Sequence, residues 1–373
     1  MENFDQLGVR RKFVSAIKEM GINTPTEIQA QVIPLLLKSN TDLIAQAQTG
    51  TGKTAAFGLP LLHKIDPKRK EVQGLILCPT RELGQQIAKQ IFKFTKHSDK
   101  IFTEAVFGGA QIEPQMSALR RPTHIVVATP GRLIDLIKRK AVDLRKVRTV
   151  ILDEADEMLS MGFKKELDEI LSSLPAIQNK WLFSATMPNG IKNIVQKHLS
   201  AKAIKIEVSK KKQVNKNIDH QFLICEEKEK LHVLIQMLNS DPTARGVVFC
   251  KTKATAQTLA KQLQAKNIPT DAIQGDLKQI ERDKVMRAFK NESLRILVAT
   301  DLAARGIDVE GLSFVVHYQL PDKDEYYTHR SGRTARAGNR GISLALITSP
   351  EIKQIRWFEK TLGISFKQIR RSK

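Results

Sequence analysis

Two short segments of the chain contain the residue types that nucleoside triphosphate hydrolysis requires. The first is Ala47-Gln48-Thr49-Gly50-Thr51-Gly52-Lys53-Thr54, a loop of small residues whose backbone N–H groups can cradle phosphates. Lys53 is placed for the β- and γ-phosphates, and the Thr54 hydroxyl is placed for magnesium. The second segment, Val150-Ile151-Leu152-Asp153-Glu154-Ala155-Asp156, predicts a buried strand that ends in carboxylates.

The carboxylates complete the chemistry that the loop begins. Asp153, which stands 100 residues after Lys53, can hold the magnesium through water, and Glu154 can orient and deprotonate an attacking water. A glycine turn before a helix and acidic residues after a strand are each common on their own. The two segments in one chain favour a nucleotide hydrolysis site over those separate structural readings.

Short β-rich runs alternate with amphipathic helical stretches, which is typical of parallel α/β sheets. The helices expected most clearly in the second half cover 253–264 and 279–289. The expected strands are 75–78, 125–128, 150–152 and 180–183 in the first half and 247–250, 296–299 and 314–316 in the second.

An internal repeat, called the internal echo below, predicts that the two halves are copies of one α/β fold. Cys78-Pro79-Thr80 and Cys250-Lys251-Thr252 each close a strand and lead into a helix. Val127-Ala128-Thr129 follows Thr80 by 49 residues, and Val298-Ala299-Thr300 follows Thr252 by 48. Ligands bind at the carboxyl ends of such strands, so the four threonines are expected at corresponding edges. The second copy has no phosphate loop.

Composition favours a polyanionic partner. With 61 Lys plus Arg against 39 Asp plus Glu, the formal net charge is +22, which suits nucleic acid although it could also serve solubility. Aromatic residues make up only 5%, which argues against base stacking as the main binding device and favours contacts to the backbone.

The cysteines and the hydropathy exclude other classes. Cys78, Cys225 and Cys250 lack the paired spacing of a zinc site or a disulfide framework. No apolar run approaches the roughly 20 residues that span a bilayer, and the N-terminus lacks a signal-peptide core. We therefore expect a cytoplasmic protein that does not enter membranes.

Over nearly its full length the chain resembles a DEAD-box RNA helicase of superfamily 2, and Asp153-Glu154-Ala155-Asp156 spells the family name. Thr24-Pro25-Thr26-Glu27-Ile28-Gln29 resembles the adenine-reading Q motif, and Phe4 lies 17 residues before its Gly21. Gln29 is expected to read the adenine edge, because its amide both donates and accepts. Ile22 stands where the family usually has an aromatic residue, and Gly84 where it usually has alanine.

The resemblance implies two tandem RecA-like domains with ATP and Mg²⁺ as cofactors. The implied domains are 1–208, which binds ATP, and 218–365, the C-terminal helicase domain, with a basic tail at 366–373. The linker between the two domains is expected at 209–217, because the run from Lys210 to Asn217 is polar and cationic and lacks apolar periodicity. The implied RNA contacts, mainly to the sugar-phosphate backbone, come from Pro79, Arg81, Gly109, Thr129, Pro130 and Arg132 in the first domain and from Thr252, Gly275, Gln279 and Thr300 in the second.

Further motifs imply coupling between ATP and RNA. Ser184, Thr186, Asp156 and His329 are the implied coupling residues, and Asp301 is expected near the nucleotide ribose. In His329-Arg330-Ser331-Gly332-Arg333-Thr334-Ala335-Arg336, the residues Arg333 and Arg336 resemble arginine fingers for the γ-phosphate. Ser331 and Ala335 replace the commoner isoleucine and glycine of this motif.

We therefore expect a monomeric RNA-dependent ATPase that separates short RNA duplexes or remodels RNA–protein complexes when ATP and RNA close two domains together. Two alternatives stay open from the residues alone. A non-enzymatic RNA clamp would keep the fold without turnover, and a DNA helicase or translocase would differ only in contacts to the 2′-hydroxyl. A small-molecule kinase shares the phosphate loop but leaves the second domain and its arginines unexplained.

Overall fold

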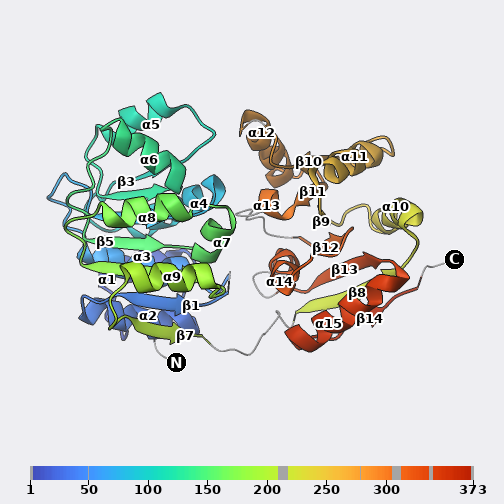
Figure 1. Ribbon diagram of the computed structural model, residues 1–373, viewed down its shortest axis with the longest axis horizontal. Helices are drawn as coiled ribbons and strands as arrows, with labels where there is room; N and C mark the ends of the chain where they lie inside the picture. Colours follow the sequence, from blue (N-terminus) through green and yellow to red (C-terminus); the bar gives the residue numbers. More distant parts are fainter. Residues whose placement is uncertain are drawn as a thin grey trace. The chain divides into compact units, whose positions relative to one another are not determined.

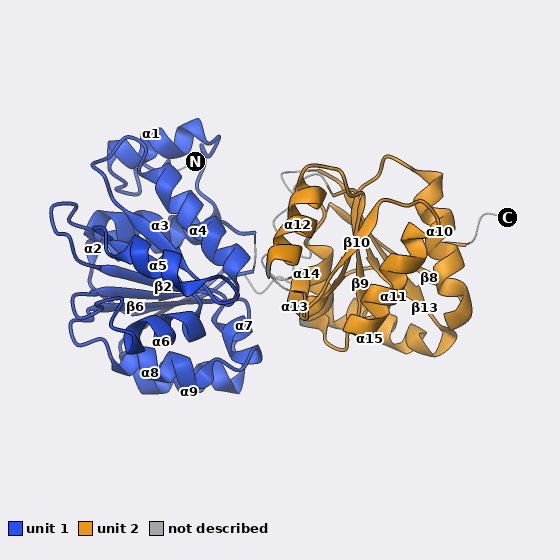
Figure 2. Ribbon diagram, turned by 90° about the horizontal axis from the view of Figure 1, so that it is seen from above, with its two compact units in different colours: residues 1–210 blue, residues 211–373 orange. Residues whose placement is uncertain are grey.

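The chain forms two compact units, residues 1–210 and 211–373, each with helices on both faces of a parallel sheet (Figures 1 and 2). The computed structural model describes residues 3–48, 50–208, 217–277, 279–304, 312–335 and 339–370. The predicted α/β class with two parallel sheets is confirmed.

The described strands of the first unit form one seven-stranded sheet in the order β3-β4-β2-β5-β6-β1-β7, and every pairing between them is parallel. This order brings the ends of β5, β6 and β1 together on one half of the sheet. The strands are β1 (Leu43–Gln46), β2 (Gly74–Leu77), β3 (Thr103–Val106), β4 (Ile125–Ala128), β5 (Thr149–Leu152), β6 (Asn179–Ser184) and β7 (Ile204–Glu207).

Helices cover both faces of this sheet. The first four pack on one face and the later ones on the other. The helices are α1 (Arg11–Glu19), α2 (Glu27–Lys38), α3 (Lys53–Lys64), α4 (Arg81–Phe94), α5 (Ile112–Leu119), α6 (Pro130–Lys138), α7 (Ala155–Ser160), α8 (Lys164–Ser172) and α9 (Asn189–His198).

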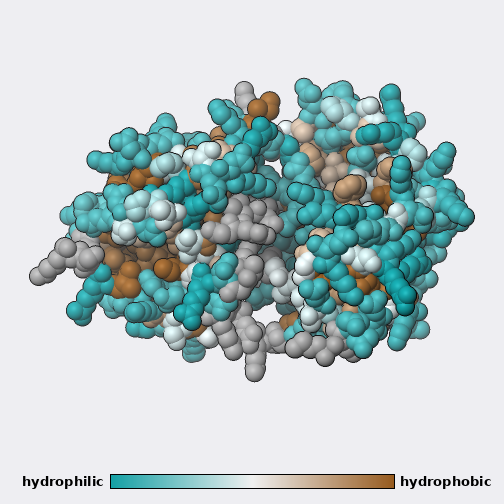
Figure 3. Space-filling model, turned by 180° about the vertical axis from the view of Figure 1, so that it is seen from behind, coloured by the Kyte–Doolittle hydropathy of each residue, from teal (hydrophilic) through white to brown (hydrophobic). Residues whose placement is uncertain are grey.

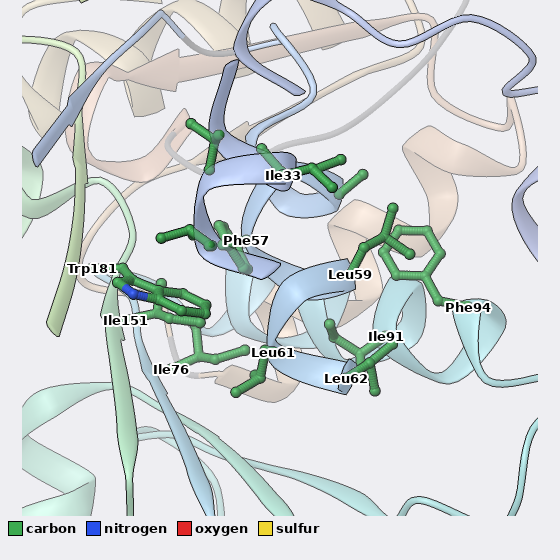
Figure 4. Close-up of a cluster of buried hydrophobic side chains, with 14 of the residues drawn as sticks. Ile33, Phe57, Leu59, Leu61, Leu62, Ile76, Ile91, Phe94, Ile151 and Trp181 are labelled. Carbon is green, nitrogen blue, oxygen red and sulfur yellow. The ribbon is translucent and has the colours of Figure 1, made fainter. Parts of the chain in front are cut away.

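The strands of the first unit are short and buried on both faces, which explains why they read as continuous apolar runs. Ile151 of β5 packs into one hydrophobic cluster, while Val150 and Leu152 pack into the other, as the alternation of a strand requires. Figure 4 shows the first cluster, with Phe57, Leu59, Leu61 and Leu62 from α3, Ile76, Ile151 and Trp181 from the strands, Ile33 from α2, and Ile91 and Phe94 from α4.

The second unit repeats the same sheet. Its described strands run in the order β10-β11-β9-β12-β13-β8-β14, all parallel, which is the order of the first sheet with seven added to each number. The strands are β8 (Ile218–Ile224), β9 (Gly246–Cys250), β10 (Thr270–Ile273), β11 (Ile296–Thr300), β12 (Phe314–His317), β13 (Gly341–Ile347) and β14 (Lys367–Gln368).

Helices cover both faces of the second sheet as well. The residues of α10 and α11 pack on one face, and those of α12 to α15 pack on the other. The helices are α10 (Lys230–Ser240), α11 (Lys253–Gln264), α12 (Gln279–Lys290), α13 (Asp301–Ala304), α14 (Asp324–Ser331) and α15 (Ile352–Leu362), with 3₁₀ turns at Glu227–Glu229 and Ser349–Glu351.

The threonines of the internal echo occupy equivalent positions in the two units. Thr80 is the N-cap of α4 and its hydroxyl accepts from Leu83 N at 3.3 Å. Thr252 is the N-cap of α11 and accepts from Thr255 N at 3.1 Å. Because β2 and β9 are equivalent strands, the prediction of two copies of one fold is confirmed.

The structure differs from the expected tail at 366–373. Phe366 is buried in the core of the second unit, and β14 pairs with β8 at the edge of the sheet, so 366–368 belong to the folded unit. Of the expected linker, 209–216 lie outside the described residues. The carbonyl of Asn217, the last residue assigned to it, accepts from Gly341 N at 3.0 Å and so belongs to the second unit.

The visible face of each unit carries mostly hydrophilic side chains, with hydrophobic ones in small separate patches (Figure 3). Among the helices described by the structure, none has the length and apolar character needed to cross a bilayer.

A buried polar cluster joins α14 to the second sheet. Ser343 Oγ lies 2.9 Å from Ser331 Oγ, 3.1 Å from His317 Nε2 and 3.2 Å from the Tyr327 hydroxyl. The Tyr327 hydroxyl also lies 2.6 Å from His220 Nδ1. Ser331, which departs from the usual isoleucine, is therefore a member of a polar network that spans β8, β12, β13 and α14.

The histidines of this cluster should make the second unit sensitive to acid. Burial lowers the pKa of His220 to about 4 and lowers the pKa of His317 well below its ordinary value. Below about pH 6.5 the histidines of the unfolded chain bind protons, whereas those of the folded unit stay neutral. The free energy of unfolding is therefore highest above about pH 6.5 and falls as the pH drops toward 4. The expected slope is about 1.4 kcal/mol per pH unit for each histidine.

Urea denaturation at pH 7 and pH 5 checks this expectation. The chain has two tryptophans, so a Trp181→Phe background leaves Trp357 to report on the second unit. His317→Gln should flatten the decline in stability between the two pH values, and an unchanged decline would contradict the assignment.

Candidate active site

The phosphate loop joins β1 to the N-terminus of α3. Gly50 and Gly52 have φ values of +80° and +86°, which residues with a side chain rarely adopt. Helix α3 begins directly after them, at Lys53. A Cβ at Gly52 would collide with the amide nitrogen of Gln29. A side chain would therefore be strained at both glycines, which precede the N-terminus of α3, the kind of position where anions bind.

The segment resembling the Q motif is tied directly to this loop. Gln29 Nε2 donates to the carbonyl of Gly52 at 3.0 Å, and the Thr26 hydroxyl donates to the carbonyl of Thr51 at 2.8 Å. Gln29 Oε1 also accepts from Thr26 N at 2.9 Å. One N–H and one lone pair of the amide remain for adenine. Sequence reasoning expected the adenine contact but missed this bond to the loop.

Lys53 and Asp153 face each other in a buried position. Lys53 Nζ donates to the carbonyl of Ala47 at 3.3 Å and lies 4.0 Å from Asp153 Oδ1, and the two side chains are only 6% and 4% exposed. Burial raises the pKa of Asp153 to about 6, although Lys53 opposes the rise. A cation bound beside this carboxylate would favour its ionised form.

The donor set fits magnesium that arrives with a nucleotide. Mg²⁺ in such sites takes one or two protein oxygens and completes its shell with phosphates and water. Asp153 offers a carboxylate, and Thr54, in the first turn of α3, offers a half-buried hydroxyl. Within the described ranges there is no group of three or more His, Cys, Asp or Glu that could hold a metal alone.

Glu154 has an unusual backbone. Its φ and ψ of 50° and 51° lie in the left-handed region, where residues other than glycine are uncommon and strained. The residue is the N-cap of α7 and is half-buried, and its N–H donates to Asp153 Oδ1 at 3.0 Å. The two adjacent residues therefore differ in burial: Asp153 is buried beside Lys53, and Glu154 is half-buried.

Three of the predicted coupling residues meet in the first unit. Asp156 Oδ2 accepts from both the N–H and the hydroxyl of Thr186 at 2.8 Å. The Ser184 hydroxyl donates to the Thr186 carbonyl at 2.6 Å. The loop after β6 is thereby fixed to the start of α7, next to Glu154. The fourth residue, His329, lies on α14 in the second unit.

The structure describes three of the remaining residues that were predicted to bind the nucleotide, Ala47, Gln48 and Phe4. Ala47 is buried, and the Gln48 carbonyl accepts from the Thr51 hydroxyl at 2.8 Å, which closes the loop on itself. Thr49 lies outside the described residues. Phe4 is fully buried in the hydrophobic core of the first unit, and its place against adenine stays a prediction.

The residues predicted to contact RNA in the first unit follow β2, β3 and β4, which are neighbours in the sheet. Thr129 Oγ1 accepts from Gly108 N at 3.3 Å, and Arg132 Nη2 donates to the Ala110 carbonyl at 2.8 Å. These bonds hold the loop that contains Gly109. The Arg81 guanidinium lies over the Phe107 ring at 4.6 Å, and both Pro79 and Pro130 are buried beside this edge.

The corresponding predictions in the second unit follow β9, β10 and β11, the equivalent neighbours. Thr252 caps α11, and Thr300 ends β11 with 8% exposure. A Cβ at Gly275 would lie 3.3 Å from Lys253 Cε, so a side chain at position 275 would be in tight contact with this lysine. Gln279 begins α12, and its side chain lies outside the described part of the chain.

Asp301 is bound by a residue to which the sequence prediction gave no role. Arg330 Nε and Nη2 donate to the two carboxylate oxygens at 2.6 and 2.7 Å, and Arg330 Nη1 donates to the Gln319 carbonyl at 2.8 Å. The guanidinium is 1% exposed and lies over the Phe249 ring. The predicted contact of Asp301 with a ribose therefore competes with a bidentate ion pair.

Asp301→Ala should destabilise the second unit. The substitution leaves the Arg330 charge buried without its counterion, a loss that typically costs about 3–5 kcal/mol. Urea denaturation in the Trp181→Phe background measures it, and the double variant Asp301→Ala/Arg330→Met should recover most of the loss. Unchanged stability combined with weakened ATP binding would instead favour a role at the ribose.

The predicted arginine fingers follow α14. Arg333 lies in the turn after this helix and is half-buried, whereas Arg336 lies outside the described residues. Arg330, three residues earlier, anchors the end of α14 to Asp301 and so fixes the base of this turn.

Known proteins match the chain in both units. The DEAD/DEAH box helicase family matches residues 26–194, and the helicase conserved C-terminal domain matches residues 229–338. The DEAD-box ATP-dependent RNA helicase CshA of Geobacillus kaustophilus is 41% identical over 97% of this chain and 77% of its own length. The CshA of Bacillus cereus is 41% identical over 97% of this chain and 68% of its own.

A solved structure extends the match to the fold. Dbp5 of S. cerevisiae, bound to RNA and ADP BeF3, is 30% identical, covers 99% of this chain and 96% of its own, and has a TM-score of 0.90. The two parallel sheets are therefore tandem RecA-like domains. The chain belongs to the DEAD-box family of ATP-dependent RNA helicases, as the resemblance of its motifs predicted.

Proposed function

We propose that the protein is an RNA-dependent ATPase that unwinds short RNA duplexes or remodels RNA–protein complexes through closure of its two units. One observation carries the proposal. The ends of β5, β6 and β1 in the first unit carry residues predicted to bind the nucleotide, while the ends of β3, β4 and β2 and their equivalents in the second unit carry the residues predicted to bind RNA.

The ATPase step follows from residues of both units. The loop N–H groups and Lys53 hold the phosphates. Thr54 and Asp153 would hold Mg²⁺, which would supply charge neutralisation on the phosphates. Glu154 takes a proton from the attacking water, whose oxygen bonds to the γ-phosphorus while the bond to the bridging oxygen breaks. ADP and phosphate leave. Arg333 and Arg336 stabilise the charge of the transition state from the second unit.

Coupling follows because two ligands each favour one conformation. ATP and RNA both bind residues of both units, so each lowers the free energy of the closed state and raises the affinity of the other. The Asp156–Thr186 contact links the nucleotide carboxylates to the loop after β6. In the closed state the RNA path accepts one bent strand, and the complementary strand is expelled locally. The protein acts as a monomer.

RNA as the partner is supported by the net charge and by the relatives. The formal charge of +22 suits a phosphate backbone, and Dbp5, at 30% identity, was solved with RNA bound. Hydroxyls and glycine N–H groups at the strand ends contact backbone rather than bases, so binding should be independent of sequence.

An ATPase assay titrated with single-stranded RNA tests the proposal. Phosphate release should rise severalfold to saturation with RNA, and the RNA concentration at half-saturation should increase with salt because counterions are released on binding. Lys53→Ala provides the blank for contaminating ATPases. Equal stimulation by matched DNA would favour a DNA helicase or translocase, and RNA binding without any turnover would favour a non-enzymatic clamp.

A further inference from the structure

The outward face of α15 carries an exposed tryptophan. Trp357 is 44% exposed, whereas Trp181, the other tryptophan of the chain, is fully buried in the first unit. The Trp357 ring is held on one side by the Phe358 ring, with centroids 5.3 Å apart and planes at 47°. A large aromatic ring that is anchored yet open to solvent is the type of surface on which a base can stack.

The position of Trp357 follows from the period of the helix. Ile355, Phe358 and Leu362 are buried and attach α15 to the sheet. The residues on the opposite side recur at i, i+3, i+4 and i+7, so they share one face. They are all exposed, and they are Lys353, Arg356, Trp357 and Lys360.

The charge of this face is positive. Lys353 and Lys360 form no ion pair with any residue that the structure describes. Arg356 Nη1 pairs with Glu359 at 2.6 Å, and Glu359 also accepts from Phe366 N at 2.9 Å, so the one carboxylate of the helix is already engaged. Two free ammonium groups therefore flank the indole along the helix.

We infer that this face of α15 is an additional binding site for single-stranded RNA, where a base stacks on Trp357 and Lys353 and Lys360 contact phosphates. The inference rests on the proposed function for the class of ligand. An acidic peptide would use the lysines but leave the exposed indole unexplained, whereas a polynucleotide uses both. Stacking is tolerant of sequence, as the backbone contacts of the motifs are.

The site is separate from the residues predicted to contact RNA in this unit. The inner side chains of α15 pack with Phe222 of β8 and Ala345 of β13, and Figure 1 shows the helix over β8 and β14. Thr252 follows β9, which is three strands from β8 in the sheet. At about 4.8 Å per strand the two places are roughly 14 Å apart across the sheet. Trp357 also lies on the face of α15 that is turned away from the sheet, so a strand bound at Thr252 must continue around the helix to reach it. A strand just long enough for the motif residues does not reach Trp357.

Binding of short and long oligouridylates to the full chain tests the inference. Trp357→Ala should weaken binding of the long oligonucleotide by about fivefold or more and leave the short one unchanged. Trp357→Phe, which keeps an aromatic face, should restore most of the affinity. In the Trp181→Phe background, the emission of Trp357 should be quenched by the long oligonucleotide.

Matched charge variants complete the design. Lys353→Ala/Lys360→Ala should weaken long-strand binding and reduce its salt dependence, because two phosphate contacts are lost. Lys261→Ala/Lys266→Ala removes two exposed lysines at the far end of α11 and should have no such effect. Equal affinity of wild type and Trp357→Ala for the long strand would overturn the inference.

Two further results separate this inference from others. If polyglutamate quenches Trp357 as well as the long oligouridylate does, the face is an acidic-partner surface and the RNA inference is overturned. If wild-type ATPase is stimulated by RNA while Trp357→Ala binds long RNA normally, only this inference fails. If RNA stimulates no turnover at all, the proposed function fails instead.

Discussion

Glu154→Gln is expected to abolish ATP turnover while ATP and RNA still bind. The amide keeps the shape of the carboxylate but cannot take a proton from water, and loss of such a base typically lowers the rate by about 10²–10⁴. The turn that positions residue 154 has φ of 50°, and glutamine carries the same backbone cost as glutamate there. Steady-state phosphate release and equilibrium binding of a fluorescent ATP analogue measure the two parts.

The control is Glu169→Gln, which makes the same change of charge on an exposed residue of α8. It should leave turnover unchanged. If Glu154→Gln hydrolyses ATP at the wild-type rate, another group must activate the water. If nucleotide binding is lost as well, Glu154 acts in the structure of the β5–α7 turn rather than as a base.

The architecture was largely predictable because the chain repeats itself. The spacing of Thr80 to Thr129 and of Thr252 to Thr300 predicted two copies of one fold, and the identical strand orders confirm it. The strands that were recognised lie inside the sheets and are mostly apolar because they are buried on both faces. They are β2, β4, β5, β6, β9, β11 and β12. Three interior strands, β1, β8 and β13, were nevertheless not among the expected strands.

The edge strands were not predicted because they lack that signal. β7 reads Ile-Lys-Ile-Glu and is mostly exposed, and β10 reads Thr-Asp-Ala-Ile. Each is four residues long, and each forms only because a neighbouring strand supplies hydrogen bonds. The strand β14 has only two residues, both exposed, and was assigned to a tail because it carries no apolar pattern either. Its partner β8 lies far away in the sequence.

In the candidate site, the sequence predicted which residues take part but not which residues they contact. Motifs predicted roles for Lys53, Asp153 and Gln29, but the bond from Gln29 to the Gly52 carbonyl depends on how α2 packs beside the phosphate loop. Asp301 and Arg330 are 29 positions apart, and they pair because α13, which follows β11, lies close to α14 in the second unit. Partners brought together by tertiary packing leave no local pattern in a single sequence.

The largest loss of rate is expected from Arg333→Ala. An arginine that reaches the γ-phosphate from the second unit acts chiefly on the transition state, where loss of such a finger typically lowers kcat by about 10³–10⁵. Binding of ATP and RNA in the ground state should change by much less. Arg333→Lys should restore little, because an ammonium lacks the planar fork that contacts two phosphate oxygens.

Single-turnover hydrolysis at saturating ATP and RNA measures the effect, and Arg340→Ala, an exposed arginine of the same unit, is the matched control. The comparison also tests the split site. A variant that lowers hydrolysis in the presence of RNA to the level seen without RNA would show that the second unit contributes only when RNA is bound. Hydrolysis by Arg333→Ala within tenfold of wild type would assign the transition-state charge to another residue and remove the main reason for requiring closure.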